Sequence, residues 1–134
     1  MQESMNIVAI IPARMASSRF PGKPMANILG KPMIGHVYEH IAHSPLLTTT
    51  AVATCDEEIY DYVISIGGIA VMTADTHKRA SDRCAEALLK LEAMQERRYN
   101  IVVMVQGDEP MTNEEMIAEA LNPMLADPDL QIVN

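Results

Sequence analysis

The chain has 134 residues, of which 49% are hydrophobic and 21% are charged, a composition typical of one folded domain rather than of a disordered segment. The net charge of −8 argues against binding to nucleic acid or to a membrane surface, and no apolar run approaches the roughly 20 residues of a membrane-spanning helix. The N-terminal residues lack the basic segment of a signal peptide, and the two cysteines are not spaced as in CxxC. We therefore expect a cytoplasmic protein with reduced thiols.

Short β-branched runs alternate with amphipathic stretches along the whole chain. The runs predict strands at 7–11, 49–53, 69–72, 101–105 and 130–133. The amphipathic stretches predict helices at 32–44, 57–65, 81–98 and 112–125. This alternation predicts an α/β fold, with a mainly parallel sheet and helices on both of its faces. The run at 101–105 is apolar without a break, which favours a position at the centre of the sheet.

The sequence also predicts one helix cap and the buried faces of two helices. Asp56 precedes the helix at 57–65, where its side chain is expected to cap the first turn. The buried face of that helix is predicted to contain Ile59, Tyr62, Val63 and Ile66, and the face of the helix at 81–98 to contain Ala85, Leu88, Leu89 and Leu91. The chain stops within an apparent strand, so we expect the amino-terminal portion of a longer protein.

Three cations follow the first predicted strand within a short loop. Arg14, Arg19 and Lys23 lie among small residues, and no acidic residue occurs between Glu3 and Glu39. Ligands of open α/β sheets bind beyond the carboxyl ends of the strands, so this loop is predicted to bind phosphate groups. The alternative is a set of solvated surface cations. The Walker motif is absent because Pro24 follows Gly22-Lys23, and no GxGxxG follows the strand.

Two carboxylates follow the apolar run at 101–105. Asp108 and Glu109 lie on a glycine-containing turn, where a hard metal ion could be held near phosphates. We predict that Asp108 is a Mg²⁺ ligand, against the alternative that it only caps the following turn. Glu109 is the weaker candidate of the two.

Other polar clusters are less specific. The stretch at 77–83 enters a helix, and Ser81 and Arg83 could contact a polar ligand or could belong to a solvated helix start; spacing alone does not decide. Three histidines share a helix face at positions 36, 40 and 43, but without a further ligand or a base they are predicted to be surface or half-buried side chains. Cys55 and Cys84 are predicted to be core thiols.

Together these residues resemble one family, the sugar-activating cytidylyltransferases, most closely those that act on 3-deoxy-manno-octulosonate (Kdo). The resemblance extends over about residues 7–125. It rests on four stretches, which are 11–14 with 20–24, 30–34 with His36-Val37, Ala53-Thr54 with Asp56, and 105–111. The order IPAR, PGKP and VQGDEP is the most specific part.

The resemblance implies a Rossmann-like three-layer sandwich of the nucleotidyltransferase type. It also implies an enzyme that joins CTP to the anomeric hydroxyl of an ulosonic acid and releases pyrophosphate, with Mg²⁺ as cofactor and a homodimer as the full-length form. Catalysis would involve Arg14, Lys23 and Asp108, of which Asp108 holds the metal. The nucleotide-binding residues implied are Ala13, Arg14, Arg19, Lys23, Ser81, Arg83 and Gln106.

The chain departs from the family pattern in three respects. Arg79-Ala80-Ser81 stands where relatives have Ser-Gly-Thr, and Cys55 precedes Asp56 where Asp usually follows Ala-Thr directly. Residues 1–134 would form a single nucleotide-binding domain that lacks the family's carboxyl-terminal half. The alternatives are therefore a cytidylyltransferase for another acidic sugar, such as an amino-Kdo or sialic-type acid, and a non-catalytic nucleotide-binding fragment. A glycosyltransferase is a weaker alternative.

Overall fold

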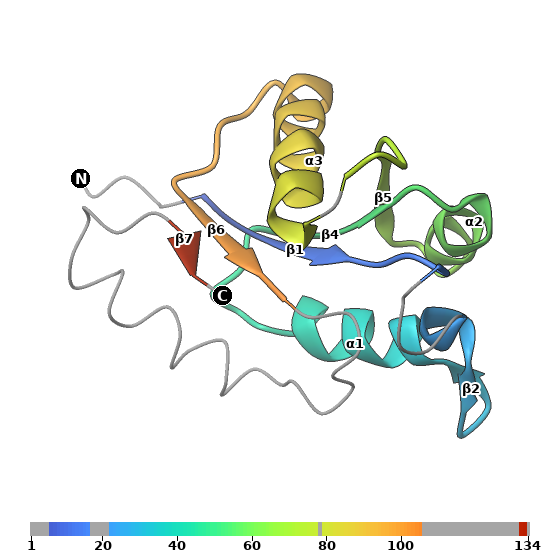
Figure 1. Ribbon diagram of the computed structural model, residues 1–134. Helices are drawn as coiled ribbons and strands as arrows, with labels where there is room; N and C mark the ends of the chain where they lie inside the picture. The colour runs from blue at the N-terminus through green and yellow to red at the C-terminus, as the bar shows by residue number, and fades with distance from the viewer. Residues whose placement is uncertain (1–5, 17–21, 78, 106–131, 134) are drawn as a thin grey trace.

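The computed structural model describes residues 6–16, 22–77, 79–105 and 132–133, which form a sheet with helices on both faces (Figure 1). The main sheet has five strands in the order β5-β4-β1-β6-β7, and every neighbouring pair is parallel. The strands are β1 (Ile7–Pro12), β4 (Thr49–Thr54), β5 (Ile69–Met72), β6 (Ile101–Met104) and β7 (Ile132–Val133). The predicted α/β fold with a mainly parallel sheet is therefore confirmed, and each predicted strand is found within the described residues.

The central strand is β1, so the prediction that 101–105 lies at the centre was wrong. β1 pairs with β4 on one side and β6 on the other, and Ala9 lies opposite both Thr50 and Val103. The helix between β5 and β6, α3 (Ala80–Gln95), packs over β1, β4 and β5. Val102 and Met104 of β6 face the same side of the sheet as α3 and are half-buried.

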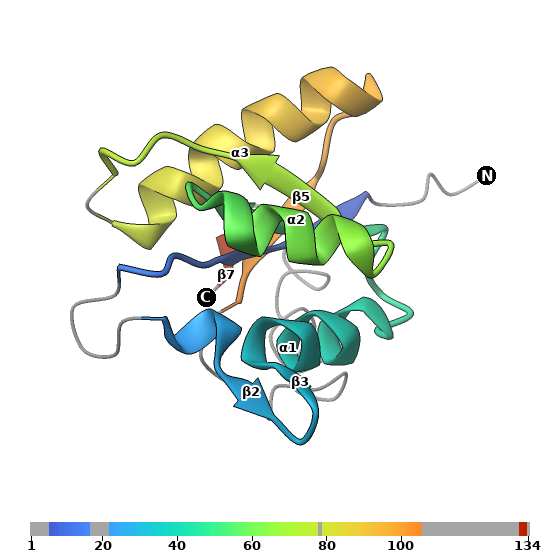
Figure 2. The ribbon, with the colours of Figure 1, turned by 90° about the vertical axis from the view of Figure 1, so that its right-hand side faces the viewer.

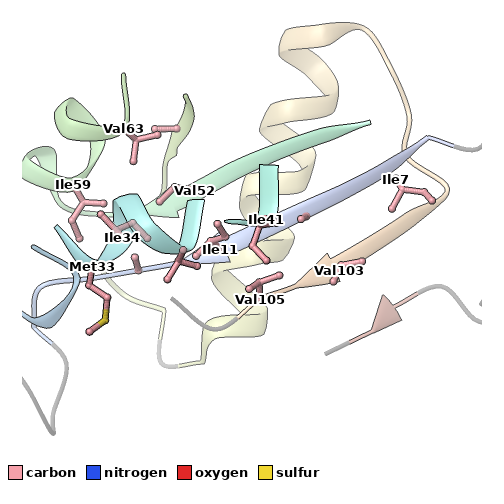
Figure 3. Packing of buried hydrophobic residues seen from close by; sticks show 14 of the residues in the cluster. Ile7, Ile11, Met33, Ile34, Ile41, Val52, Ile59, Val63, Val103 and Val105 are labelled. Carbon is pink, nitrogen blue, oxygen red and sulfur yellow. The ribbon is translucent and has the colours of Figure 1, made fainter. Parts of the chain in front are cut away.

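Side chains of β1 alternate between two hydrophobic clusters, as a strand buried on both faces requires. Ile7, Ala9 and Ile11 pack with α1 (Met33–Ala42) and α2 (Glu57–Ser65) in the larger cluster, part of which Figure 3 shows. Val8 and Ile10 face α3 on the opposite side. The three layers are thus α1 with α2, the sheet, and α3 (Figure 1).

The helices confirm most of the predicted faces, with corrections in α2 and α3. Ile59 and Val63 of α2 are buried as predicted, and the buried residues of α1 include Met33, Val37 and Ile41. Ile66, however, lies just beyond α2 and is 37% exposed. In α3 the prediction was half right. Leu91 is buried and Leu88 packs partly buried against the core, whereas Ala85 and Leu89 face solvent, and the buried face is completed by Arg83, Cys84 and Ala87.

The end of α3 also differs from the prediction. The helix ends at Gln95 rather than near residue 98, because Glu96 adopts a left-handed conformation with φ of 51°. Its backbone N–H donates to the Glu92 carbonyl and closes the last turn. The predicted helix at 112–125 lies outside the described residues.

A small hairpin precedes α1. It consists of β2 (Asn27–Ile28) and β3 (Lys31–Pro32), which pair antiparallel, and it projects beside α1 (Figure 2). Leu29 and Gly30 form its tip with φ of 52° and 92°, the positive values that a tight hairpin turn requires. Among the described residues, no helix combines the length and apolar character needed to cross a membrane.

Candidate functional site at the carboxyl edge of the sheet

The carboxyl ends of β1, β4 and β5 meet at one edge of the sheet, because these strands are parallel neighbours. The pairing continues just beyond the strand ends. Ala13 N donates to Ala53 O at 2.9 Å, and Thr73 N donates to Thr54 O at 2.9 Å. The residues that follow each strand are therefore held side by side at the edge where α/β proteins bind their ligands.

After β1 the chain comes back to Met15 through a hydrogen bond from Gly22. Met15 O accepts a hydrogen bond from Gly22 N at 2.7 Å, and Gly22 has φ of 78°, a conformation that glycine adopts without strain. The chain then enters a short 3-10 helix, η1 (Lys23–Met25). This closure places the backbone of Lys23 next to the segment that contains Arg14, so two of the predicted phosphate-binding residues are brought together.

Asp56 has a role that the sequence did not predict. It stands at the N-cap of α2 but makes no side-chain capping hydrogen bond, so the predicted cap was wrong. Its Oδ2 instead accepts a hydrogen bond from Met15 N at 2.8 Å. Met15 is thus held through its N–H by Asp56 and through its carbonyl by Gly22. A carboxylate just after the neighbouring strand was the available signal, but the partner lies 41 residues away in sequence.

Arg83 extends from the first turn of α3 to the same edge and is only 3% exposed. Its Nε donates to Thr73 Oγ1 at 3.0 Å, and its Nη2 lies 3.3 Å from Ala74 O and 3.7 Å from Cys55 Sγ. The guanidinium group therefore joins the segments that follow β4 and β5. A cation buried at this edge also adds positive potential there.

The segment after β5 is fastened to α3 by a second group of polar side chains. Glu86 Oε1 accepts from Ala74 N at 3.0 Å and contacts His77 Nε2 at 2.6 Å, while Lys90 Nζ lies 2.8 Å from Glu86 Oε2. The hydrogen bond from Lys90, with those from Ala74 and His77, lowers the pKa of Glu86 to about 2. This group of side chains was not predicted from the sequence, although Arg83, Glu86 and Lys90 recur at helical spacing on one face of α3.

The other predicted site residues differ in how the structure places them. Ala13 is buried and Arg14 is half-buried at the end of β1, whereas Ser81 is exposed in the first turn of α3. Arg19, Gln106 and Asp108 lie outside the described residues. Within the described ranges, no group of three or more His, Cys, Asp or Glu could hold a metal ion, so the predicted Mg²⁺ site at Asp108 stays a prediction.

The histidines and cysteines agree with their predicted placement, with one exception. His36 is half-buried and its Nε2 contacts Ile28 O, while His40 and His43 are exposed. Cys84 is a core thiol, and burial raises its pKa to about 12. Cys55 is not a core residue but lies half-buried at the site edge, where desolvation, and then the charge of Asp56, raise its pKa.

The family model described as cytidylyltransferase matches residues 8–133, nearly the whole chain. The chain belongs to the cytidylyltransferase family. This confirms the resemblance that the sequence motifs indicated, and with it the nucleotidyltransferase type of fold.

Curated relatives of this cytidylyltransferase chain carry a more specific name. The 3-deoxy-manno-octulosonate cytidylyltransferase of Syntrophus aciditrophicus is 49% identical over 124 residues, which cover 92% of this chain and 49% of the relative. The protein of the same name from Geobacter metallireducens is 46% identical over 128 residues, 96% of this chain and 48% of the relative. The chain thus spans about half the length of these relatives.

Solved structures agree with the cytidylyltransferase fold. CMP:2-keto-3-deoxy-manno-octonic acid synthetase in complex with CTP superposes with a TM-score of 0.82 at 39% identity, over 93% of this chain and 49% of the other. A 4-diphosphocytidyl-2C-methyl-D-erythritol synthase superposes with a TM-score of 0.67 at 15% identity, over 87% of this chain and 53% of the other, and at that identity the likeness concerns the fold alone.

Proposed function

We propose that this chain is the CTP-binding part of a cytidylyltransferase that joins CTP to the anomeric hydroxyl of Kdo or a close ulosonic acid. The observation that carries the proposal is the hydrogen bond between Gly22 N and Met15 O, which brings the backbone segments of Arg14 and Lys23 together. These segments lie beside Asp56 and Arg83 at the edge of the sheet. The names and identities of the relatives support the choice of CTP and Kdo. We further propose that the active form is a cytoplasmic homodimer.

The reaction places two demands on this edge. The anomeric oxygen attacks the α-phosphorus of CTP while the bond to the bridging oxygen breaks, so pyrophosphate leaves and the hydroxyl proton is released. Such a transfer requires in-line positioning and neutralisation of charge more than a covalent intermediate. In our proposal Arg14, Arg19 and Lys23 bind the triphosphate and offset the charge on the leaving pyrophosphate.

The cytidine would lie next to the ends of β1 and β6. In the proposal the backbone of Ala13 and the side chains of Ser81, Arg83 and Gln106 surround it. Arg83 is already donating to Thr73, Ala74 and Cys55, so it would act on the base mainly through its charge and through the segments that it holds. Asp108 would hold Mg²⁺, which would offset the negative charge of the phosphates.

Calorimetric titration of the chain with CTP in the presence of Mg²⁺ tests the nucleotide part of the proposal. We expect CTP to bind more tightly than CMP or UTP. Removal of Mg²⁺ by a chelator should weaken the binding of CTP more than the binding of CMP. A chain that binds CTP no better than UTP would contradict the proposal.

The substitution Lys23→Ala tests the phosphate role of the loop. Removing one cation that contacts a phosphate should weaken CTP binding by about tenfold or more and leave CMP binding nearly unchanged. Arg97→Ala is the matched control, because Arg97 is exposed beyond the far end of α3. Equal losses for CTP and CMP in Lys23→Ala would assign Lys23 a structural role instead.

Measuring pyrophosphate release with several ulosonic acids tests which sugar is the acceptor substrate. Turnover with Kdo above that with amino-Kdo or sialic-type acids supports the narrower proposal. The rival sugar is motivated by Arg79, which is exposed and pairs with Asp82 at the start of α3. CTP binding without any pyrophosphate release would favour a non-catalytic nucleotide-binding role for this chain, which spans half the length of its relatives.

A further inference from the structure

Met15 connects the end of β1 to the loop that contains the predicted phosphate-binding cations. Both of its backbone polar groups have partners from outside β1, since Asp56 Oδ2 accepts from its N–H at 2.8 Å and Gly22 N donates to its carbonyl at 2.7 Å. The first of these hydrogen bonds joins the loop to a different βα unit. The direction in which the loop leaves the sheet therefore depends on Asp56.

Asp56 is itself held firmly. It follows β4, the strand adjacent to β1, and its N–H donates to Thr54 Oγ1 at 3.1 Å. Its carbonyl accepts from Tyr60 N at 3.0 Å in the first turn of α2. With its backbone fixed at a strand end and at a helix start, the carboxylate offers a rigid acceptor to Met15.

Other roles for this carboxylate fit the structure less well. It does not cap α2, since no side-chain capping hydrogen bond is formed. As a free negative charge beside a triphosphate it would repel the ligand, whereas as an acceptor for a backbone N–H its charge is partly satisfied. The acceptor role is thus the one that the geometry favours.

We propose that Asp56 is a positioning residue for triphosphate binding, which holds the Met15 backbone and with it the adjacent Arg14 at the carboxyl edge of the sheet. This inference rests on the proposed function, because its ligand is CTP. Preorganised loops bind more tightly because less conformational entropy is lost when the ligand is bound. Loss of the acceptor should therefore affect CTP, which reaches the loop through its outer phosphates, more than CMP.

Two variants of Asp56 separate its role as a hydrogen-bond acceptor from its negative charge. Asp56→Asn removes the charge but keeps a side-chain oxygen that can accept from Met15 N–H, whereas Asp56→Ala removes both. Asp61→Ala is the matched control, since Asp61 is an exposed carboxylate on the same helix. Asp56→Ser keeps a favourable helix N-cap residue with a shorter side chain, and it replaces Asp56→Ala if that variant does not fold.

The experiment measures CTP and CMP binding by calorimetry and exchange of the Met15 amide hydrogen in the absence of nucleotide. For Asp56→Ala we expect CTP binding weakened by about 10- to 100-fold, CMP binding changed much less, and faster exchange at Met15. Asp56→Asn and Asp61→Ala should resemble the wild type in all three measurements.

The outcomes distinguish the two proposals. If the wild type binds no CTP, the proposed function fails and this inference fails with it. If the wild type binds CTP and Asp56→Ala binds it equally well, only the inference is overturned. If Asp56→Asn is as weak as Asp56→Ala, the charge rather than the acceptor is required, and the inference is again overturned.

Discussion

Gly35 allows α1 and α2 to approach closely, and this contact can be tested by substitution. A Cβ atom built on Gly35 would lie under 3.0 Å from Tyr62 Oη, closer than real Cβ atoms approach other atoms, and 3.1 Å from Tyr62 Cζ. Gly35→Ala therefore forces the Tyr62 ring of α2 to move. The consequence extends to the site, because α2 begins next to Asp56.

The magnitude follows from two opposing terms. Overpacking of this kind costs about 1–3 kcal/mol of the free energy of unfolding, whereas replacing Gly by Ala within a helix contributes up to about 1 kcal/mol in favour of folding. We expect Gly35→Ala to lower the free energy of unfolding by about 1–2 kcal/mol. For a chain of 134 residues this corresponds to a decrease of roughly 3–8 °C in melting temperature.

A double-mutant cycle identifies the cause. Tyr62→Phe removes the hydroxyl, after which the nearest ring atom to the added Cβ is Cζ at 3.1 Å, a distance that a shift of a few tenths of an ångström relieves. In the Tyr62→Phe background, Gly35→Ala should change the free energy of unfolding by less than about 0.5 kcal/mol. The assay is urea unfolding of the four proteins followed by circular dichroism. An equal loss in both backgrounds would refute the contact with Tyr62 Oη as the cause.

Two further predictions concern α3. Leu91 has no exposed surface, so Leu91→Ala should lower the free energy of unfolding by about 2–5 kcal/mol in the same urea assay. Leu89 is 69% exposed, so Leu89→Ala should change the free energy of unfolding by less than about 0.5 kcal/mol. Similar losses in the two variants would contradict the buried face of α3 that the structure shows. Glu86→Gln should be less stable than the wild type at pH 7, and this difference should shrink as the pH falls from about 5 towards 2, because a carboxyl whose pKa is lowered from 4.5 to about 2 on folding stabilises only while it is ionised. A difference that stays constant across this pH range in thermal melts would mean that Glu86 stabilises through its shape rather than its charge.

The sequence predicted the elements well because their signals are local. The β-branched runs and the helical periodicity depend on neighbouring residues, and they located β1, β4, β5 and β6 and the helices between them. The errors arose where the packing of an element against distant parts of the chain overrode its local sequence pattern. Leu89 continued an apolar pattern along α3 but lies on the solvent side, because the helix turns Ala87 and Leu91 towards the sheet.

The cationic loop was also recognisable from the sequence alone. Arg14 and Lys23 stand near a strand end in an acidic chain, and that contrast in charge needs no tertiary information. The same is true of the motifs that indicated the cytidylyltransferase family. The roles of Arg19, Gln106 and Asp108 remain predictions from those motifs.

Only the tertiary structure decided which residues hold this loop and its neighbours in place. Strand order is not encoded locally, so the adjacency of β1 and β4, and with it the hydrogen bond from Met15 to Asp56, could not be read from the chain. The pattern at Asp56 favoured a helix cap, yet the nearby strand end offered a backbone donor instead. Likewise, the buried hydrogen bond from Arg83 to Thr73, which holds Arg83 at this edge, could not be predicted from the sequence. The sequence alone specified the elements and the charges that we predict to bind phosphate, and the packing of distant strand ends specified how the backbone around Met15 is held.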